Sequence, residues 1–478
     1  MAENEKKFVT ELTDINEDLS QWYTDVITKA DLCDYGPVKG TMVIKPYGFE
    51  IWEHIKEYLD IEFKKAGSKN AYFPMLIPES FLKKEAEHVE GFAPEVAVVT
   101  YAGGQELTEK LIVRPTSETI IGEMYSKWIK SYRDLPMIMN QWCNVVRWEK
   151  TTRPFLRTSE FLWQEGHTVQ ATEKDAVDNT IQMLNVYVKM CKELLAIPVL
   201  SGRKTEREKF AGAVDTYGIE AVMRDGKCLQ AGTSHYLGTN FAKSADIKYL
   251  DKDGEWKYGY TTSWGVSTRL IGAVIMTHGD ERGIKLPPRI APIQVVIVPI
   301  AQHKEGVLDK ASELYSALKD AGIRAYMDDS NQSPGWKFNQ WEMKGVPLRI
   351  ELGPRDIENG SCVVVRRDTH EKLNLPLADL SKQIQDLLDK VQQNMYDMAL
   401  SFVKDNSYEV DTIDDMVNCI NNRHVSIAYH CGDIECEEAL KAETGIQSRV
   451  IICEDDGDHK CIRCGKKAKH KAYFAKQY

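Results

Sequence analysis

The stretch RWEKTTRPFLRTSEFLWQEGH (residues 147–167) is the most informative part of this chain. It places Arg147, Arg153 and Arg157 around a polar loop, with Glu149 beside the first arginine, and an apolar cluster follows. Because guanidinium groups bind phosphate and carboxylate in bidentate geometry, several of them around one loop indicate a polyanionic ligand. Taken alone, the same residues also fit a surface hairpin joined by ion pairs.

Length and composition are those of an ordinary multidomain protein. The chain has 478 residues, of which 43% are hydrophobic and 28% are charged. One hydrophobic core does not extend over such a length, so about two to four domains are expected. No apolar run approaches the roughly 18 residues that span a bilayer. The polar N-terminus MAENEKKFVTELTD lacks the apolar segment of a signal peptide. We therefore expect a cytoplasmic protein without membrane association.

The charge balance argues against a protein that coats nucleic acid non-specifically. The formal net charge is −11 at pH 7, and such coating depends on a large excess of Lys and Arg. Residues 460–478 are the exception, because they contain seven Lys or Arg and no Asp or Glu. RNA recognition through a local basic face is therefore still compatible with the sequence.

The spacing of apolar residues predicts the elements of the first 280 residues. Positions with helical period predict helices at 17–32, 48–66 and 174–196. Apolar or β-branched runs predict strands at 71–77, 136–146, 228–250 and 256–264. Neither a G-x-G-x-x-G nor a P-loop sequence opens a helix. Any nucleotide must therefore be held in another way, and clustered arginines are the obvious candidates.

The composition changes at GIKLPPRIAP (283–292), where two adjacent prolines indicate a linker. The run IQVVIVPI (293–300) that follows is typical of a buried strand. Helices and strands then alternate, which favours a compact α/β domain with a largely parallel sheet. Its further elements are expected at 304–321, 323–327, 335–344, 347–352 and 379–404, and residues 405–478 form a third, cysteine-bearing unit.

Three other segments carry polar residues in an apolar context: RPTSET (114–119), QAGTSHYLGTNF (230–241) and TTSWGVSTRLIGAVIMTHGD (261–280). In the third, an apolar helix begins near Arg269, and its N-terminal N–H groups are free to bind an anion. Each segment also has a plainer explanation. Residues 116–118 could cap a helix, His235 could be a satisfied core residue, and Arg269 could lie on the surface.

In this order and spacing, the segments resemble class II aminoacyl-tRNA synthetases, specifically prolyl-tRNA synthetases of the archaeal and eukaryotic type. Class II enzymes share three degenerate motifs. Residues 36–55 resemble the first, Arg147 to Arg157 the second, and Gly265 to Arg269 with the following helix the third. The marks of the subfamily are TSE (116–118), FLWQEGH (161–167) and QAGTSHYLGTNF (230–241). The resemblance covers essentially the whole chain.

The resemblance implies a multidomain α+β and α/β protein. It places a class II catalytic core with an antiparallel sheet in residues 1–286, an α/β anticodon-binding domain in 287–400 and a small zinc-binding α+β domain in 401–478. The implied activity is ATP-dependent conversion of L-proline to prolyl-adenylate, followed by transfer to the 3′ end of tRNA(Pro). The implied assembly is a homodimer, with Pro46 at the end of the interface strand.

For ATP, the resemblance implies a binding site around the second and third motifs. Arg147 would bridge the amino-acid carboxylate and the α-phosphate, and with Arg269 it would be catalytic. Glu149 would accept from the adenine amino group, while Phe155 and Arg269 would cover the two faces of the ring. Mg²⁺ would be shared mainly with the phosphates. The other expected ATP contacts are Arg157, Thr158, Gln230, Thr233 and Ser267.

For proline, the resemblance implies a pocket beside that site. The secondary ammonium needs an acceptor such as Glu118 or Thr116, and the pyrrolidine ring needs an apolar wall such as Trp163. No side chain has to act as a nucleophile, because positioning and electrostatics carry an in-line displacement. Besides Arg147, the expected pocket residues are Thr116, Glu118, Trp163, Glu165, His167, His235 and Ser263.

Alanine is smaller than proline, and hydrophobic fit discriminates by only about 1–3 kcal/mol per methylene. Bacterial-type enzymes of the resembled family carry a large editing domain between the second and third motifs. Here residues 168–227 provide only 60 positions, much of them one helix plus strands. We therefore expect no editing in cis.

The expected anticodon-binding domain contains charged residues that could contact RNA. Glu351 could accept from a guanine amino edge, and Lys337, Arg349 and Arg366 could contact phosphates. Each of them could equally be a solvated surface charge.

The last unit contains two close cysteine pairs, Cys431 with Cys436 and Cys461 with Cys464, separated by 24 residues. This spacing suits tetrahedral thiolate binding of a structural Zn²⁺. A metal-free cluster is the alternative. Other potential ligands lie close by in the sequence (Cys453, His430, His459 and His470), but the four thiolates are the preferred set.

Two other functions stay open from the sequence. One is a non-catalytic, synthetase-like RNA-binding or regulatory protein, although such relatives usually lose an ATP-binding arginine and Arg147, Arg157 and Arg269 are all present. The other is a synthetase for threonine or another amino acid, although a threonyl enzyme needs metal ligands that this pocket does not obviously offer.

Overall fold

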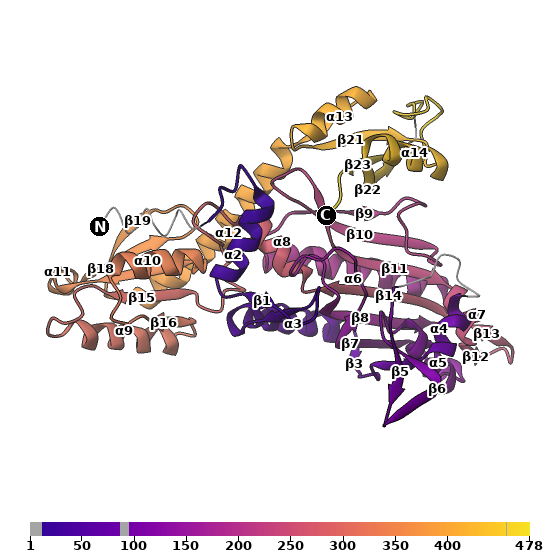
Figure 1. The fold of residues 1–478 in the computed structure, drawn as a ribbon, viewed down its shortest axis with the longest axis horizontal. Helices are drawn as coiled ribbons and strands as arrows, with labels where there is room; N and C mark the ends of the chain where they lie inside the picture. Colours follow the sequence, from indigo (N-terminus) through magenta and orange to yellow (C-terminus); the bar gives the residue numbers. More distant parts are fainter. Residues whose placement is uncertain (1–11, 87–94, 456) are drawn as a thin grey trace.

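The computed structural model describes residues 12–86, 95–455 and 457–478. Figure 1 shows three modules along the chain. The N-terminal module contains the elements from α2 to α8, the middle module those from β15 to α12, and the C-terminal module those from β20 to β23. Helix α12 leads from the middle module to the C-terminal module, which lies beside strands β9 and β10 of the N-terminal module.

A seven-stranded sheet forms the centre of the N-terminal module. Every neighbouring pair is antiparallel except β3 with β7 at one edge. The antiparallel core implied by the class II resemblance is therefore confirmed. In spatial order, the strands are β3 (Lys69–Asn70), β7 (Met137–Val146), β8 (Glu160–Gln170), β14 (Tyr260–Ser267), β11 (Cys228–Gly238), β10 (Asp215–Val222) and β9 (Val199–Arg203).

Three helices bury the apolar face of this sheet. Helices α3 (Pro46–Lys65), α6 (Glu173–Glu193) and α8 (Arg269–His278) contribute side chains to one large core together with alternate strand residues such as Trp264 and Val266. Phe63 of α3 lies 4.8 Å from the Trp264 ring, measured between ring centroids. Gly166 is required behind that ring, because a Cβ there would come within 2.2 Å of Trp264. The opposite face of the sheet is consequently left for polar residues.

Smaller elements surround the sheet. Helix α2 precedes a two-stranded hairpin of β1 and β2, and strands β4, β6 and β5 form a separate sheet. Their bounds are α2 (Leu19–Lys29), β1 (Cys33–Tyr35), β2 (Met42–Ile44), β4 (Leu76–Pro78), α4 (Glu79–Ala86), β5 (Ala97–Ala102), β6 (Gln105–Val113), α5 (Glu118–Trp128), η1 (Tyr132–Asp134), α7 (Asn240–Ala245), β12 (Lys248–Leu250) and β13 (Trp256–Tyr258).

Two of the predicted strands in this module need correction. The segment 71–77 is mostly irregular, and only Leu76–Pro78 forms strand β4. The segment 228–250 is not one strand region, because helix α7 interrupts it after the left-handed Gly238. The three predicted helices and the strand at 136–146 are confirmed within a few residues.

The middle module has a mixed sheet, so the prediction of a largely parallel one is wrong. Strands β16 and β17 flank β15 in parallel, whereas β18 and β19 continue the sheet antiparallel. The elements are β15 (Val295–Pro299), α9 (Val307–Asp320), β16 (Ala325–Met327), α10 (Pro334–Met343), β17 (Leu348–Leu352), α11 (Pro354–Glu358), β18 (Ser361–Arg366), β19 (Lys372–Pro376) and α12 (Leu380–Asp405).

The C-terminal module is a four-stranded sheet in the order β20, β21, β23, β22 with two helices. Only β20 and β21 run parallel. The bounds are β20 (Ser407–Glu409), α13 (Ile413–Asn421), β21 (Val425–His430), α14 (Ile434–Thr444), β22 (Gln447–Glu454) and β23 (His470–Ala475).

Buried ion pairs join the modules. Arg449 of β22 donates to both carboxylate oxygens of Glu220 on β10 at 2.9 Å, and Lys204 contacts the same carboxylate. All three side chains are at most 1% exposed. In the middle module, Arg367 pairs in bidentate fashion with Asp280, just after α8, at 2.6 and 2.8 Å.

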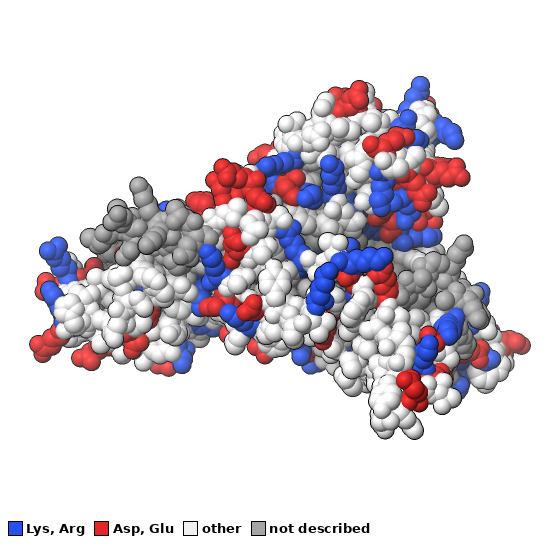
Figure 2. Space-filling model, in the orientation of Figure 1, with Lys and Arg blue, Asp and Glu red and all other residues white. Residues whose placement is uncertain are grey.

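No helix among the described residues is both long and apolar enough to cross a membrane. Acidic and basic side chains are interspersed over the face shown in Figure 2. This distribution agrees with the negative net charge in arguing against a broad basic coat.

Candidate active site

Polar residues form a regular array on the uncovered face of the central sheet. On β8, Trp163, Glu165 and His167 alternate and therefore share one face. Strand β14 places Ser267, Gly265 and Ser263 opposite these three residues in turn. Next in the sheet, β11 places Thr233 beside Gly265 and His235 beside Ser263. The array brings together three segments that are far apart in the sequence.

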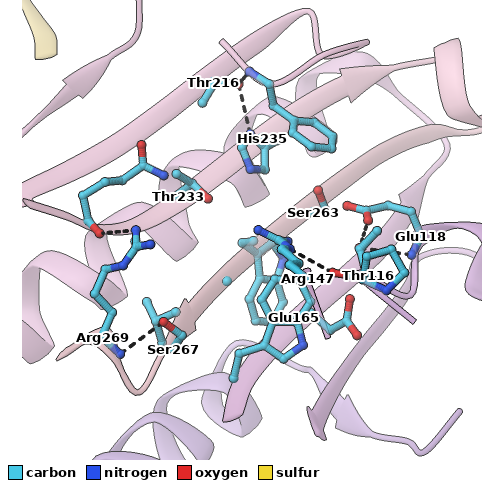
Figure 3. Close-up of a pocket in the computed structure, with 18 of the residues that line it drawn as sticks. Thr116, Glu118, Arg147, Glu165, Thr216, Thr233, His235, Ser263, Ser267 and Arg269 are labelled. Atoms are coloured by element: carbon cyan, nitrogen blue, oxygen red, sulfur yellow. Dashed lines mark hydrogen bonds between the residues drawn. The ribbon is translucent and has the colours of Figure 1, made fainter. Parts of the chain in front are cut away.

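The array forms the floor of a cavity of about 620 Å³. Most of the residues predicted for ATP and proline line this cavity, which Figure 3 shows in close-up. They are Thr116, Glu118, Arg147, Glu149, Trp163, Glu165, His167, Gln230, Thr233, His235, Ser263, Ser267 and Arg269.

Phe155, Arg157 and Thr158 do not line the cavity. The expected role of Phe155 as a face for adenine is wrong, because its φ of +60° turns the ring into the core, where it is 3% exposed. Phe161 of β8 lines the cavity instead. Arg157 extends outward, with its side chain 49% exposed and 3.8 Å from the Glu149 carboxylate. Thr158 is buried and donates its hydroxyl to the carbonyl of Glu160.

Arg147 lies in the middle of the cavity (Figure 3). Its Nε donates to the carbonyl of Pro115 at 3.0 Å, and its guanidinium lies 5.6 Å from the Phe161 ring and 5.3 Å from the Trp163 ring. Burial lowers the pKa of Arg147, and the nearby charges of Glu118 and Glu165 oppose that shift. The side chain is thus fixed on one edge, which leaves the terminal nitrogens to bind an anion.

Arg269 lies at one end of the cavity, at the start of α8. Its Nε donates to the carbonyl of Leu156 at 2.9 Å and its Nη1 to that of Gln230 at 3.2 Å. Burial, together with the charges of Arg157 and Arg147, lowers the pKa of Arg269 to about 10. Mutual repulsion among cations of this kind is relieved by a bound polyanion.

Glu118 and Thr116 lie at the opposite end, where β6 leads into α5. Their side chains are hydrogen-bonded to each other. Burial raises the pKa of Glu118, while the charges of His167 and Arg147 oppose the shift. A carboxylate in such surroundings is stabilised by a bound ammonium group.

Glu165 and His167 form a buried ion pair at the base of this end. His167 Nε2 lies 2.9 Å from Glu165 Oε2. Burial opposes ionisation of the carboxyl, yet hydrogen bonds with His167 and Ser117 lower the pKa of Glu165 to about 2. Burial likewise opposes the imidazolium, but the hydrogen bond with Glu165 raises the pKa of His167.

His235 remains neutral in the cavity wall. Burial and the charge of His167 lower the pKa of His235 to about 3. Its Nδ1 lies 3.0 Å from the Thr216 hydroxyl, which also accepts from the backbone N–H of Phe210. The contact with Thr216 fixes the orientation of the imidazole ring in the cavity wall.

Phe210 and Phe161 are cavity residues that the sequence analysis missed. The ring of Phe210 lies 4.7 Å from His235 and is stacked with Phe241 at 6.1 Å. Phe161 shares the cavity-lining face of β8 with Trp163 and Glu165, because successive positions among the three differ by two. That alternation was a usable signal for Phe161, whereas the irregular segment around Phe210 carried none.

Family models match three parts of the chain. Residues 99–278 match the tRNA synthetase class II core domain (G, H, P, S and T), residues 294–387 an anticodon binding domain, and residues 413–478 the prolyl-tRNA synthetase C-terminal domain. The first match contains most of the residues that line the cavity.

Curated relatives match from end to end. A proline–tRNA ligase of Alkaliphilus oremlandii is 59% identical over 481 residues, covering 100% of both chains. The chain belongs to the proline–tRNA ligase family. Proline–tRNA ligase 2 of Clostridioides difficile is 56% identical, again over 100% of both chains. The crystal structure of prolyl-tRNA synthetase from Cryptosporidium parvum, complexed with halofuginone and AMPPNP, matches with a TM-score of 0.93 and 41% identity, covering 98% of this chain and 96% of that one.

The chain is accordingly an aminoacyl-tRNA synthetase that attaches proline to tRNA(Pro) at the expense of ATP. The prediction of a class II synthetase made from the three motifs is confirmed. The alternatives of a non-catalytic paralogue and of a threonyl enzyme receive no support from these relatives.

The charged residues predicted to contact the anticodon are engaged within the anticodon-binding domain. Lys337 is 1% exposed and donates to the carbonyl of Asp328 at 2.7 Å. Arg349 is 7% exposed, pairs with Glu351 at 2.9 Å and also contacts Glu342. Phosphate contact by these two cations is therefore contradicted. Arg366 is likewise paired, with Asp368 at 2.6 Å, so none of the four predicted residues has a free charge.

The predicted cysteine pairs converge in the C-terminal domain of this ligase. Cys436 Sγ lies 3.9 Å from Cys461 Sγ, and Cys464 Sγ lies 3.6 Å from Cys431 Sγ. His430, Cys431, Cys436 and Cys461 all have a ligand atom within 4.8 Å of one another. Although burial opposes ionisation, a hydrogen bond with His430 lowers the pKa of Cys461 below its ordinary value. The sequence analysis named His430 as a potential ligand close by but preferred the four thiolates.

Proposed function

We propose that the cavity binds ATP and proline at opposite ends, with Arg147 between them. The observation that carries this proposal is the central place of Arg147, with its Nε fixed on Pro115. Glu118 with Thr116 lies on one side of it and Arg269 with Ser267 on the other. An arginine so placed can contact the proline carboxylate and the α-phosphate of ATP together, and so neutralise charge that grows between them.

In this proposal the Arg269 end holds the nucleotide. Glu149 accepts from the adenine amino group, and Phe161, in place of Phe155, covers one face of the adenine ring opposite Arg269. Gln230, Thr233 and Ser267 provide further polar contacts. Arg157, with its exposed guanidinium, is suited to the outer phosphates at the mouth of the cavity.

The Glu118 end holds proline. Glu118 and Thr116 accept from the secondary ammonium, and the rings of Trp163, Phe210 and His235 wall the pyrrolidine. The neutral state of His235 supports this role, because a cation there would repel the ammonium group. Ser263 completes the edge of the pocket.

The first chemical step is an in-line displacement. A proline carboxylate oxygen attacks the α-phosphorus, the bond to the bridging oxygen breaks, and pyrophosphate leaves with that electron pair. Mg²⁺ bound with ATP would supply positive charge for the leaving group. The chain supplies alignment and cationic stabilisation, so the step requires no general base. A terminal ribose hydroxyl of the tRNA then attacks the adenylate carbonyl and releases AMP.

The test is pyrophosphate exchange with proline, alanine, cysteine and threonine supplied separately. We expect exchange with proline to exceed that with threonine by several orders of magnitude, and Glu118→Gln to raise the KM for proline about tenfold or more with little change for ATP. Exchange that does not depend on proline, or a Glu118→Gln variant with unchanged KM for proline, would overturn the assignment.

Editing is tested by a separate assay, the deacylation of alanyl-tRNA. We propose that the chain does not hydrolyse alanyl-tRNA, because residues 168–227 are already used for β8, α6, β9 and β10 of the central module. These elements include core residues of the catalytic domain and leave no room for an inserted one. Hydrolysis of alanyl-tRNA by the purified chain would contradict the proposal.

We also propose a homodimer that functions in the cytoplasm, where tRNA is charged. The hairpin of β1 and β2, within and beside the segment resembling the first class II motif, exposes Tyr35, Val38 and Val43 at 50% or more of their surface. Apolar side chains gathered on one hairpin are typical of an interface. Light scattering should give twice the 54.4 kDa of one chain.

For the anticodon, we propose contact through aromatic rings instead of the paired charges. Tyr326 and Trp336 of the anticodon-binding domain are 44% and 42% exposed. Exposed rings stack on splayed RNA bases without losing an internal ion pair.

The cysteine cluster fits a structural zinc site formed by Cys431, Cys436, Cys461 and Cys464. Tetrahedral Zn–S bonds of about 2.3 Å place thiolates about 3.8 Å apart, and the two close pairs lie at 3.6 and 3.9 Å. Both distances are far too long for disulfides. Four protein ligands leave no position for catalysis, so the metal would stabilise the C-terminal module.

We expect purified protein to contain about one zinc per chain and Cys464→Ser to lose most of it, with a lower midpoint of thermal unfolding. His430→Ala is the matched variant, because His430 also lies in the cluster. If His430→Ala loses its zinc while Cys464→Ser keeps it, the fourth ligand is the imidazole of His430 and not the thiolate of Cys464. The readouts are zinc content and unfolding, and neither depends on activity.

A further inference from the structure

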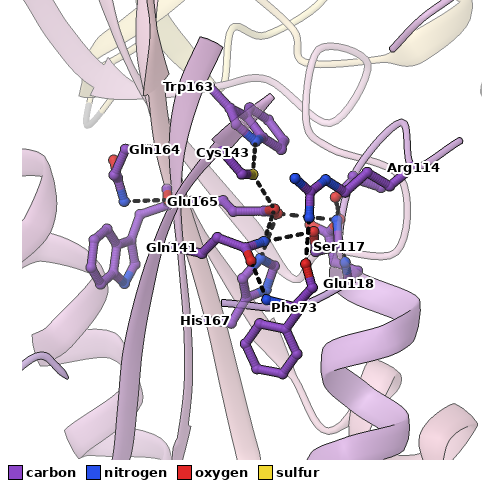
Figure 4. Close-up of polar contacts among 12 residues, drawn as sticks. Phe73, Arg114, Ser117, Glu118, Gln141, Cys143, Trp163, Gln164, Glu165 and His167 are labelled. Carbon is purple, nitrogen blue, oxygen red and sulfur yellow. Dashed lines mark hydrogen bonds and ion pairs between the residues drawn. The ribbon is translucent and has the colours of Figure 1, made fainter. Parts of the chain in front are cut away.

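Gln141 of β7 is a buried amide that lies beneath the proline end of the cavity without lining it. It is 1% exposed and pairs across the sheet with Glu165. All three of its polar contacts are made within the protein. Its Oε1 accepts from the backbone N–H of Phe73 at 2.5 Å, and its Nε2 donates to Ser117 Oγ and to Glu165 Oε1, both at 3.0 Å. Figure 4 shows these contacts around the end of the Gln141 side chain.

The partners of Gln141 come from three separate segments. Phe73 belongs to the irregular stretch before β4, Ser117 lies between β6 and α5, and Glu165 is on β8. The side chain therefore joins pieces that no continuous secondary structure connects. Only a primary amide offers the required acceptor and two donors, and asparagine is one methylene too short.

Ser117 is held from two sides. Its hydroxyl accepts from Gln141, and its backbone N–H donates to Glu165 Oε2 at 3.1 Å. Ser117 occupies the N-cap position of α5, yet its side chain makes no capping hydrogen bond there. The hydroxyl is thus withdrawn from its usual role at a helix end and used to fix this loop.

Fixing Ser117 fixes the residues on both sides of it. Thr116 and Glu118 are its chain neighbours, and both line the cavity. Glu165 also makes the ion pair with His167. A shift of Ser117 or Glu165 would thus displace the acceptors for the proline ammonium and the base of the pocket together.

We propose that Gln141 is a positioning residue that determines proline binding by holding Ser117 and Glu165 in register. This inference rests on the proposed role of Thr116 and Glu118 as acceptors for proline. Gln141 touches no substrate, so its effect is confined to the amino-acid end of the cavity. Gln230, Thr233, Ser267 and Arg269 of the ATP end lie on β11, β14 and α8, which carry none of the three partners of Gln141. Phe161 shares β8 with Glu165, but it is four residues away along the strand.

Gln141→Met keeps the volume of the side chain but removes all three hydrogen bonds. We expect the KM for proline in pyrophosphate exchange to rise about tenfold or more, since one lost partner is a carboxylate, with the KM for ATP unchanged within about twofold. Asn140→Leu is the matched control. Asn140 is also a buried amide of β7, but its Nδ2 donates to Asn70 at the edge of the sheet. It should leave both constants unchanged.

A double variant with Ser117 distinguishes a positioning role of Gln141 from general destabilisation of the protein. If Gln141 acts through Ser117, the Gln141→Met and Ser117→Ala effects on the KM for proline should be strongly non-additive in the double variant.

Gln141→Glu adds a pH readout. A protonated carboxyl retains the acceptor and one donor, so the KM of this variant, relative to wild type at each pH, should fall as the pH decreases from 8.5 to 6.

The outcomes are distinguishable. Equal changes in both KM values, or additive effects of Gln141→Met and Ser117→Ala, would overturn the positioning role. If Glu118→Gln leaves the KM for proline unchanged, the pocket assignment itself fails. If Glu118→Gln raises that KM while Gln141→Met does not, only the inference about Gln141 fails. Should Gln141→Met not fold, Gln141→Asn and Gln141→Glu decide by the same ratio of KM values.

Discussion

Replacement of Arg147 by Ala should lower proline-dependent pyrophosphate exchange by about three orders of magnitude. Loss of one preorganised donor to a developing anion costs about 10²–10³ in rate, and here one side chain serves two anionic groups. Burial makes the loss larger, because the substrates must displace water that enters the space. Most of the effect should appear in kcat, since the charge on the α-phosphate of the transferred adenylyl group is greatest in the transition state.

One variant tests whether the charge of Arg147 or its bidentate geometry is responsible, and a second serves as a control. Arg147→Lys keeps a cation but cannot reach both groups in bidentate fashion, so we expect an intermediate loss. Arg133→Ala serves as the control, because Arg133 is exposed on η1 and lies over the ring of Tyr132, away from the cavity. A kcat for Arg147→Ala within tenfold of wild type, in a protein with a normal circular dichroism spectrum, would remove Arg147 from its proposed role.

The sequence was sufficient to predict those parts of the fold that depend on local periodicity. The run at 136–146 is flanked by a proline and a charged loop, and it forms β7 as expected. The run after 292 forms the fully buried β15. Helix α7, by contrast, has only six residues, which is too few for a helical period to be recognised.

The sheet of the middle module was misjudged because alternation of helix and strand was extrapolated to its end. The order strand, helix, strand does predict the parallel contacts of β15 with β16 and β17. Strands β18 and β19 follow only the short helix α11 and then a direct turn, so they return antiparallel. Strand direction beyond the crossovers depends on the length of the connection.

At the site, Phe155 and Phe161 show where sequence reasoning stops. Both are aromatic and lie in the same motif, so composition cannot choose between them. The choice is made by a left-handed backbone at Phe155, which is rare for a bulky residue and cannot be read from its neighbours. Phe161, in contrast, follows from strand alternation with Trp163 once β8 is recognised.

Gln141 was not recognised for a different reason. In the sequence it lies within an apolar run and predicts nothing but strand. Its importance arises from register, because β7 and β8 place it directly opposite Glu165. Cross-strand register depends on the whole sheet and its turns. It therefore cannot be predicted from the residues of β7 alone.

Glu220→Gln should lower the free energy of unfolding by about 3–5 kcal/mol, because it leaves two buried cations without their counter-charge. Glu220 binds both Lys204 and Arg449, and no side chain of the three is more than 1% exposed. Arg449 is on β22, so the loss should fall on the step that separates the C-terminal module from the catalytic sheet. Urea unfolding followed by tryptophan fluorescence measures this step, and more than one transition is expected in a chain of several domains.

The matched control is Glu454→Gln. Glu454 of β22 also pairs with the N-terminal module, through Arg203, but its side chain is 56% exposed. A solvent-exposed pair between the same modules should contribute less than about 1 kcal/mol. Equal losses for Glu220→Gln and Glu454→Gln would show that burial is not the cause.

A triple variant, Lys204→Met with Glu220→Leu and Arg449→Met, distinguishes an unpaired charge from lost packing. Replacement of a buried ionic cluster by apolar residues of similar volume is often neutral or stabilising. We therefore expect the triple variant to recover most of the stability lost in Glu220→Gln. The kcat of the triple variant tests whether the ionic cluster also affects the ATP end of the cavity. Glu220 pairs across the strands with Gln230, whose carbonyl accepts a hydrogen bond from Arg269. Recovered stability with a lowered kcat would mean that the ionic cluster sets the geometry of the ATP end, whereas recovery of both would limit it to holding the modules together.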